Sequence, residues 1–408
     1  MHDRLATWID LVHAVQHLPE WNVNRIRYPS NRDFVVFAHV YDLNVVAFIE
    51  ALFELGWSYL FHIVLPLVGL HYLIMRFEFY TEALENVPKL SVDGTVDNSI
   101  HFSHWEGNST PTEVKADTST EIALNLVASP NRAALTQGIE LVTNNHFDTD
   151  GTLSCWTVLT GERALAYRDL LISAAEAGDF SEYSSDDGVR VSIAIQGSDQ
   201  ASPNNDDGSP LARLLAGEEV DDDARAYDLV LPKVEHLLTH INEYESLWRE
   251  GWERVVAAVE SFEKGESTVV EHSDISVITL APELFDGVGF SPTRHSAPYT
   301  AISKFAKGQL FLIAIPTTSG WFYRIDYPYY SWAETVVRPQ IARRDLSSVL
   351  QSLNSKETNS DGRWQTDNRE MTSAVKFLDT ASTLAASRLQ PDEVAEVLQQ
   401  SASLAAVS

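Results

Sequence analysis

The chain carries the sequence Gly-Ile-Glu-Leu-Val-Thr-Asn-Asn-His-Phe-Asp-Thr-Asp-Gly from residue 138 to residue 151. Its first half is apolar and typical of a short buried strand, and residues 153–159 behind it can form the start of a helix. In α/β proteins, ligands bind at the carboxyl ends of strands. The stretch therefore predicts an α/β fold with a functional site at this strand end.

An imidazole and two carboxylates lie close together in this stretch, at His146, Asp148 and Asp150. Crowding of like charges is costly unless a cation or a proton neutralises it. Aspartate oxygens and a histidine nitrogen suit Mn²⁺, Mg²⁺ or Zn²⁺, and a pair of ions about 3.5–4 Å apart would serve hydrolysis or phosphoryl transfer. We therefore predict that these three catalytic residues hold one or two Mn²⁺ or Mg²⁺ ions. Gly151 would let an anion approach the backbone, at the start of a helix whose N–H groups face a phosphate.

The spacing His146-x-Asp148-x-Asp150-Gly151 resembles the first motif of the DHH phosphoesterases, a superfamily of nucleases, phosphodiesterases and pyrophosphatases. The resemblance implies that the histidine and both aspartates hold a two-metal centre. A metal-activated water would then attack a phosphoester or a phosphoanhydride. The resemblance covers one motif, because the Asp-His-His sequence of the third motif of this superfamily is missing from the chain.

A second interpretation starts from the same residues. The run Phe147 to Leu153 resembles the first motif of haloacid-dehalogenase-type phosphatases, in which Asp148 would be the nucleophile and Asp150 the acid/base. The downstream lysine of that family is poorly placed, because no lysine occurs between Lys115 and Lys233.

A third interpretation involves no catalysis. The aspartates would cap the helix that follows the strand, and the protein would be a non-catalytic binding or scaffold protein. A calcium loop is excluded, because the twelfth position counted from His146 is Thr157 and not glutamate.

A wider set of residues resembles a family of bacterial and archaeal proteins of unassigned function. The resemblance runs from about residue 89 to about residue 375, and Glu106 stands where the family pattern has proline. The matching residues are Ser103-His104-Trp105, Gly107-Asn108, Thr110-Pro111, Asp117-Thr118-Ser119 and Asn144 to Gly151, with Leu247-Trp248, Asp274, Tyr323 and Trp332 further on.

Several polar residues outside the central stretch are further candidates for the site. Asp179 follows a predicted helix and is the candidate for an additional metal carboxylate. Arg294 and His295 lie on a predicted loop of the second half and could bind a phosphate or carboxylate across a cleft. The other candidate substrate-binding residues are His104, Asn108, Asp117, Ser119 and Gly151.

Strand and helix patterns alternate from Lys89 onward, with predicted strands at 90–92, 122–127, 138–144 and 189–195 and a predicted helix at 161–177. Such alternation favours a mostly parallel sheet with flanking helices. A polar, acidic insert is predicted at 197–223.

One long helix is predicted at 232–265, between this first domain and a smaller second α/β domain. The second domain has predicted strands at 274–280, 309–315 and 321–327, and the tail after Thr372 predicts two helices broken near Pro391. The predicted organisation is therefore a hydrophobic appendage (1–85), a site-bearing domain (86–230), a connecting helix (231–265), a second domain (266–370) and C-terminal helices (371–408).

Residues 55–75 contain no Asp, Glu, Lys or Arg and are long enough to span a bilayer. The segment lies too far from the N-terminus for a secretory signal. It predicts either a membrane anchor or a buried helical segment.

Composition limits the function classes. The formal net charge is −29, and eight of the 29 basic residues are lysine. An acidic, lysine-poor chain is typical of a salt-loaded cytoplasm, so we expect a cytoplasmic protein of a halophilic cell. A small phosphorylated substrate or short nucleotide is the expected ligand, rather than duplex nucleic acid. The single Cys155 excludes an intrachain disulfide, and the chain lacks Walker, Gly-x-Gly-x-x-Gly and Gly-x-Ser-x-Gly motifs.

Overall fold

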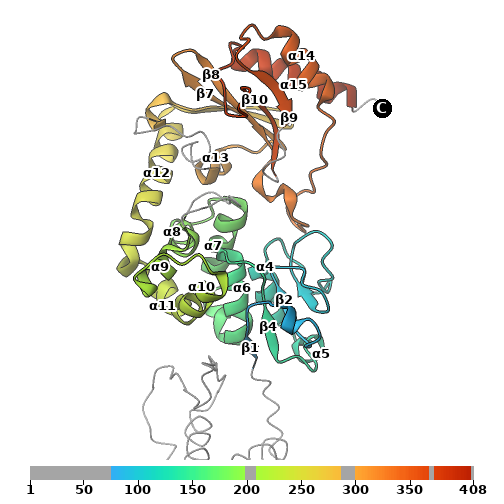
Figure 1. The fold of residues 1–408 in the computed structure, drawn as a ribbon, viewed down its shortest axis with the longest axis vertical. Helices are drawn as coiled ribbons and strands as arrows, with labels where there is room; N and C mark the ends of the chain where they lie inside the picture. The colour runs from blue at the N-terminus through green and yellow to red at the C-terminus, as the bar shows by residue number, and fades with distance from the viewer. Residues whose placement is uncertain (1–74, 198–207, 286–298, 367–371, 406–408) are drawn as a thin grey trace, which may run out of the picture.

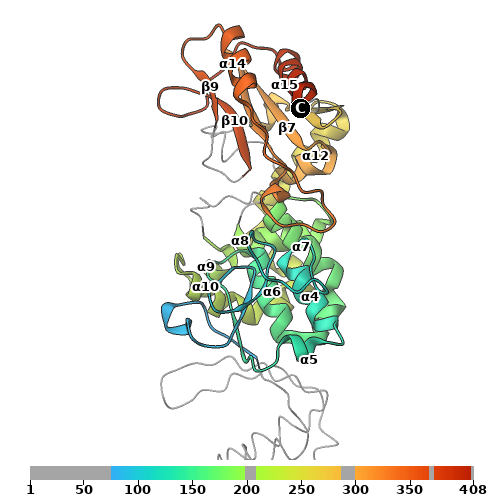
Figure 2. The same cartoon turned by 90° about the vertical axis from the view of Figure 1, so that its right-hand side faces the viewer.

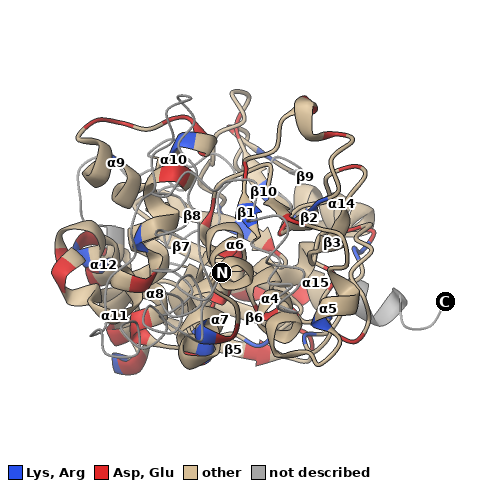
Figure 3. Cartoon of the chain, turned by 90° about the horizontal axis from the view of Figure 1, so that it is seen from below, with Lys and Arg blue, Asp and Glu red and all other residues tan. Residues whose placement is uncertain are grey.

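The structure, a computed structural model, describes residues 75–197, 208–285, 299–366 and 372–405 (Figure 1). A first part is built around a four-stranded sheet and a second part around a six-stranded sheet, which confirms the predicted α/β class. The predicted membrane segment, apart from Met75, lies outside the described residues. Among the helices that the structure describes, none combines the length and the apolar character needed to cross a membrane. Acidic residues occur in many of the helices and loops (Figure 3).

The four-stranded sheet is parallel throughout, as predicted. Its order is β1 (Arg76–Phe77), β4 (Leu141–Thr143), β2 (Leu90–Val92) and β3 (Ile100–Phe102). Each neighbouring pair is parallel, and β2 and β4 are buried along their whole length. The chain enters this sheet before residue 86, because Arg76 pairs with Leu141.

Two predicted strands of the first part are helices. Residues 122–127 belong to α4 (Ser119–Ala128), and residues 189–195 belong to α8 (Asp186–Gln196). Apart from Asn125 and Arg190, the residues of both runs are buried, and most are apolar. Periodicity alone does not separate a buried helix from a buried strand. The caps identify them, because Thr118 accepts a hydrogen bond from the backbone N–H of Glu121, and Ser185 from that of Gly188.

The remaining helices of the first part follow the prediction more closely. The central stretch forms α6 (Thr149–Thr160), and the helix predicted at 161–177 is a 3₁₀ helix, η2 (Gly161–Tyr167), followed by α7 (Arg168–Phe180). The predicted polar insert contains the short helix α9 (Pro210–Ala216), which is followed by α10 (Asp223–Val230). Helix α5 (Arg132–Leu135) lies between α4 and β4.

The connection between the parts is broken rather than one helix. It consists of η3 (Leu231–Lys233), α11 (Val234–Thr239), η4 (Ile241–Tyr244) and α12 (Glu245–Lys264). Helix α12 runs along one side of both parts (Figure 1). Trp248 and Trp252 of this helix pack into the core of the first part, whereas Phe262 packs into the second.

The six-stranded sheet is mixed. Its order is β5 (Thr268–His272), β6 (Ile275–Thr279), β7 (Leu310–Thr317), β8 (Gly320–Asp326), β10 (Ser373–Leu378) and β9 (Arg363–Thr366), and only β6 and β7 are parallel neighbours. The three predicted strands of this half are confirmed as β6, β7 and β8. The first predicted tail helix is wrong, because Ser373–Leu378 is a fully buried strand of this sheet.

Helices cover both faces of this sheet. Residues of α14 (Ser347–Lys356) and α15 (Pro391–Ala405) share one core with β7, β8 and β10, and α15 is the second predicted tail helix. On the other face, α13 (Tyr299–Phe305) packs with the end of α12. After β8 the chain forms η6 (Tyr329–Trp332) and descends to the first part (Figure 2). Residues 329–338 are called the strap below.

Two helical glycines provide a test of the packing in the first part. A Cβ at Gly188 would lie 2.7 Å from the Cβ of Ser173 and 2.8 Å from its backbone carbon, whereas one at Gly251 would meet only the flexible side chain of Ile193 at 3.2 Å. Gly188→Ala should destabilise the protein by about 1–3 kcal/mol through overpacking. Gly251→Ala should be neutral or stabilising by up to about 1 kcal/mol through helix propensity. Chemical denaturation of both variants measures the difference, and equal stabilities would contradict the close packing of α7 and α8.

Candidate metal centre

The candidate site lies where three neighbouring strands of the parallel sheet end. Asp93 directly follows β2, His104 follows β3 after one residue, and His146 and Asp148 follow β4. The carboxyl ends of parallel strands meet at one edge of a sheet, which places these side chains together. Asp150 and Asp179 reach the same place from α6 and α7.

A first group of potential metal ligands consists of Asp93, His104, Asp150 and Asp179, and all four are buried. The Nε2 atom of His104 lies 3.1 Å from Oδ2 of Asp179, 3.4 Å from Oδ1 of Asp93 and 3.8 Å from Oδ2 of Asp150. One donor atom from each residue lies within 4.8 Å of the others. This group can hold a cation away from solvent.

A second group consists of Asp93, His146 and Asp148. The Nε2 atom of His146 lies 3.2 Å from Oδ2 of Asp93 and 3.2 Å from Oδ2 of Asp148. The side chains of His146 and Asp148 are 29% and 27% exposed. The two groups therefore share Asp93, whose two oxygens face different histidines, and only the second group opens to solvent.

Three buried atoms that could bind a metal ion have no hydrogen-bond partner. They are Oδ2 of Asp93, Nε2 of His104 and Nε2 of His146. The Nδ1 atom of His104 lies 2.6 Å from the backbone oxygen of Asp117, and Nδ1 of His146 lies 3.1 Å from Oδ1 of Asn145. Both partners are oxygen acceptors, so Nδ1 carries the ring proton when the histidine is neutral. The lone pair on Nε2 then faces the carboxylates. Buried lone pairs that face one another fit a bound cation.

The pKa values reflect the crowding of charge. Burial alone would raise the pKa of Asp93, but His104 and His146 hold it well below its usual range. Burial alone would lower the pKa of both histidines, but the facing carboxylates raise it well above the usual value. Burial and the neighbouring carboxylates raise the pKa of Asp179, and burial and Asp93 raise that of Asp150 to about 7. The cluster therefore requires positive charge, as bound protons or as a metal ion.

The N-terminus of α4 orients two of the carboxylates. The backbone N–H groups of Ser119 and Thr120 each donate to one oxygen of Asp150, both at 2.7 Å. The hydroxyl of Ser119 donates to Oδ1 of Asp93 at 2.9 Å. Helix N-termini favour negative charge, so this helix stabilises a carboxylate of the cluster itself.

Asp148 caps α6, because its Oδ1 accepts from the N–H of Gly151 at 2.7 Å and its Oδ2 faces His146. A Cβ at Gly151 would lie 2.7 Å from the hydroxyl of Tyr227 and 3.0 Å from Oδ1 of Asp148, so a side chain does not fit. The N–H of Gly151 is thus used within the protein. The expected role of this N–H in binding a phosphate has no support.

The structure places the other predicted residues as follows. His104, predicted to bind substrate, lies in the first ligand group. Asn108 donates to the backbone oxygen of Trp105 at 2.9 Å and to Glu334 at 2.7 Å, outside both groups. The Asp117 carboxylate accepts from the backbone of the strap, also outside both groups. Arg294 and His295 lie outside the described residues.

Asp93 was missed in the sequence, although it joins the two groups. It stands directly after the predicted strand 90–92 and before Gly94. The carboxyl end of a strand is the place where α/β proteins bind ligands. The same argument that selected the end of β4 applies to the end of β2. The sequence therefore held the signal for this residue.

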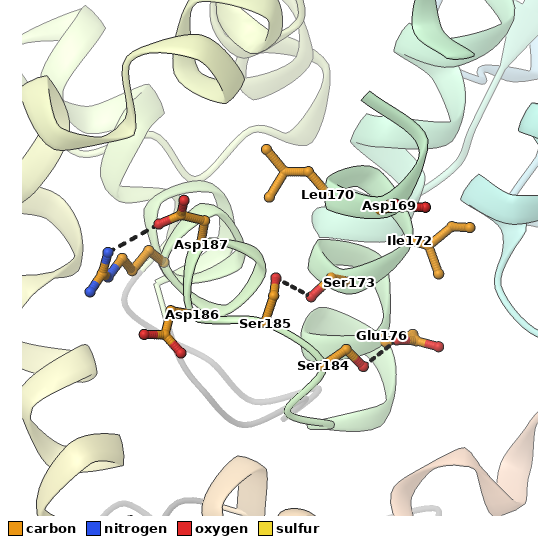
Figure 4. Close-up of a pocket in the computed structure, with 10 residues that line it drawn as sticks. Asp169, Leu170, Ile172, Ser173, Glu176, Ser184, Ser185, Asp186 and Asp187 are labelled. Atoms are coloured by element: carbon orange, nitrogen blue, oxygen red, sulfur yellow. Dashed lines mark hydrogen bonds and ion pairs between the residues drawn. The ribbon is translucent and has the colours of Figure 1, made fainter. Parts of the chain in front are cut away.

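A separate hollow of about 710 Å³ lies between α7 and the start of α8 (Figure 4). It is lined by acidic residues, serines and Arg190, and the hydroxyls of Ser173 and Ser185 lie 2.7 Å apart in it. None of the ligand residues lines this hollow, so the candidate chemistry lies elsewhere.

Shared use of Asp93 predicts different metal contents for two variants. Asp93→Ala should lose the cations of both groups, whereas His146→Ala should lose only the cation of the open group. Elemental mass spectrometry of protein reconstituted with Mn²⁺ measures this, with Asp222→Ala as control, because Asp222 caps α10 without joining either group. Equal metal content in all three variants would contradict the shared site.

A family of unknown function, DUF6687, has a model that matches residues 75–406. This range includes both sheets and every residue of the two ligand groups. No curated protein matches the chain. The chain belongs to the DUF6687 family.

Proposed function

We propose that this protein is a metal-dependent hydrolase of phosphoesters or phosphoanhydrides. The observation that carries the proposal is the position of Asp93, which belongs to both groups of ligand atoms. A carboxylate between two cations is suited to a two-metal site, in which the ions lie about 3.5–4 Å apart. Asp150, Asp179 and His104 would complete one ligand set, and His146 and Asp148 the other.

The donor types favour Mn²⁺ within the predicted pair of Mn²⁺ and Mg²⁺. Each group combines one imidazole nitrogen with carboxylate oxygens. Imidazole suits transition metals, whereas Mg²⁺ prefers oxygen ligands alone and keeps several waters. We therefore propose Mn²⁺ as the working ion of both groups.

Divalent ions in such a site neutralise charge on a phosphoryl group and lower the pKa of a coordinated water. The residues of this chain decide where a substrate can approach. His104 and Asp93 are fully buried, whereas His146 and Asp148 are about a quarter exposed, at 29% and 27%. A phosphoryl group would approach on the side of His146 and Asp148. The substrate proposed is a small phosphorylated molecule or a short nucleotide.

The motif His146-x-Asp148-x-Asp150 supports this proposal through its resemblance to the DHH phosphoesterases. That superfamily places a second imidazole near the metals through a sequence that this chain lacks. Here the second imidazole belongs to His104, which follows a different strand. The proposal therefore rests on the ligand geometry together with one motif.

A covalent phosphatase mechanism through Asp148 has less support. One oxygen of Asp148 caps α6 and the other faces His146 at 3.2 Å. Both oxygens thus have roles that suit a fixed metal ligand. A nucleophile needs one oxygen directed at the incoming phosphorus.

The test is hydrolysis by the full chain in high salt, with Mn²⁺ or Mg²⁺, of bis-p-nitrophenyl phosphate, p-nitrophenyl phosphate and pyrophosphate. We expect Mn²⁺-dependent turnover of at least one substrate. Asp148→Ala/Asp150→Ala should reduce turnover by on the order of 100-fold or more, which equals about 2.7 kcal/mol of lost transition-state stabilisation. Asp222→Ala removes a comparable helix cap and should leave turnover unchanged.

Two results would overturn the proposal. Absence of both cation binding and turnover in the wild-type protein would leave the scaffold interpretation. A beryllofluoride adduct that forms on the wild-type protein and disappears in Asp148→Asn would support the covalent mechanism instead.

A further inference from the structure

The strap descends from the second part to the first (Figure 2), where it contacts the ligand residue His104. The ring of Trp332 meets the ring of His104 edge-on, with centroids 4.9 Å apart and planes at 82°. The same tryptophan contacts Trp105 at 4.9 Å. The backbone N–H of Glu334 donates to the backbone oxygen of His104 at 2.7 Å. A ligand residue of the buried group is therefore in direct contact with the strap.

Asp117 joins the strap to the same histidine. Its backbone oxygen lies 2.6 Å from Nδ1 of His104. Its carboxylate accepts from the backbone N–H groups of three successive strap residues: Val336, Val337 at 2.8 Å and Arg338 at 2.9 Å. Asp117 is 1% exposed, so the accepting carboxylate is buried, whereas Val336 and Val337 lie at the surface. Movement of the strap would thus move the group that orients the imidazole.

Arg338 fixes the end of the strap to α7, the helix that carries Asp179. Its guanidinium donates to Asp117 at 2.8 Å, to Glu176 at 2.6 Å and to Glu182 at 2.9 Å. Charge-assisted hydrogen bonds of this kind are stronger than neutral ones. The strap is therefore attached beside two ligand residues of the buried group.

We propose that Trp332 and Asp117 are positioning residues, which hold the His104 imidazole so that the buried group of the first part can bind a cation. The proposal rests on the metal centre proposed above. The metal centre is then complete only when the strap of the second part is in place. Mutation of a residue that orients a metal-binding histidine typically lowers the metal affinity by about 10–100-fold.

Strap docking and cation binding are then linked. A cation that binds more tightly when the strap is docked must also favour the docked strap by the same factor. The N–H groups of Val337 and Arg338, which donate to Asp117, report docking directly. Mn²⁺ should therefore slow their hydrogen exchange, and the same peptide should show no slowing in Asp93→Ala.

The deciding experiment measures Mn²⁺ affinity by calorimetry on the full chain, in a His146→Ala background that leaves only the buried group. Trp332→Ala and Asp117→Asn should each weaken binding by about 10–100-fold. Trp332→Phe keeps the ring edge against His104 and should keep the affinity. The matched controls are Trp321→Ala, a half-buried tryptophan of the second core, and Asp379→Asn, which accepts N–H groups of a distant turn.

The outcomes separate this proposal from the proposed function. If neither wild type nor His146→Ala binds Mn²⁺, both proposals are overturned. If His146→Ala binds and the strap variants bind equally well, only the positioning role is overturned. A purely structural role would lower the thermal midpoint and leave the affinity of the folded protein unchanged. If Trp332→Ala does not fold, Asp117→Asn, which keeps the shape of the side chain, decides alone.

Discussion

The structure depends on how charge is balanced around the buried carboxylate of Asp93. A buried ion without compensation is costly, and the buried Asp150 and Asp179 lie close to Asp93. Two imidazoles face this carboxylate, one near each of its oxygens, at 3.4 Å for His104 and 3.2 Å for His146. The surrounding elements keep that arrangement in place. Three strand ends supply ligands, and the N-terminus of α4 holds Asp150 and Asp93. The fold thus concentrates negative charge at one sheet edge and supplies the means to neutralise it.

Elements marked by a short pattern of apolar residues could be predicted from the sequence. Strands β2 and β4 of the parallel sheet and strands β6 to β8 follow from alternating patterns, whereas β1 and β3 were not predicted. His146, Asp148 and Asp150 mark the candidate site after β4. Helices α4 and α8 were mistaken for strands, because their apolar runs are buried on nearly all sides. Strand β10 was mistaken for a helix for the same reason, since all six of its residues are buried. Capping residues would have corrected the two helices.

Long-range assembly could not be predicted in this way. The roles of Asp93 and His104 depend on the strand order β1-β4-β2-β3, which sets β2 between β4 and β3. No local pattern gives that order. The contact of Trp332 with His104 joins residues more than two hundred positions apart, through a segment that leaves the second sheet. The order of the chain places Trp332 and His104 in separate domains, although their rings are in contact.

The contrast in burial between the two ligand groups has a consequence for how a cation would enter. His104, Asp93 and Asp150 have no exposed surface, and Asp179 has 5%. His146 and Asp148 are the exposed members of the two groups, so an ion at the centre of the buried group would exchange with solvent on that side. The inner ion would then exchange more slowly than the outer one, because it has to pass the outer ligands. Occupancy of the inner position would therefore respond slowly to a change in the supply of metal.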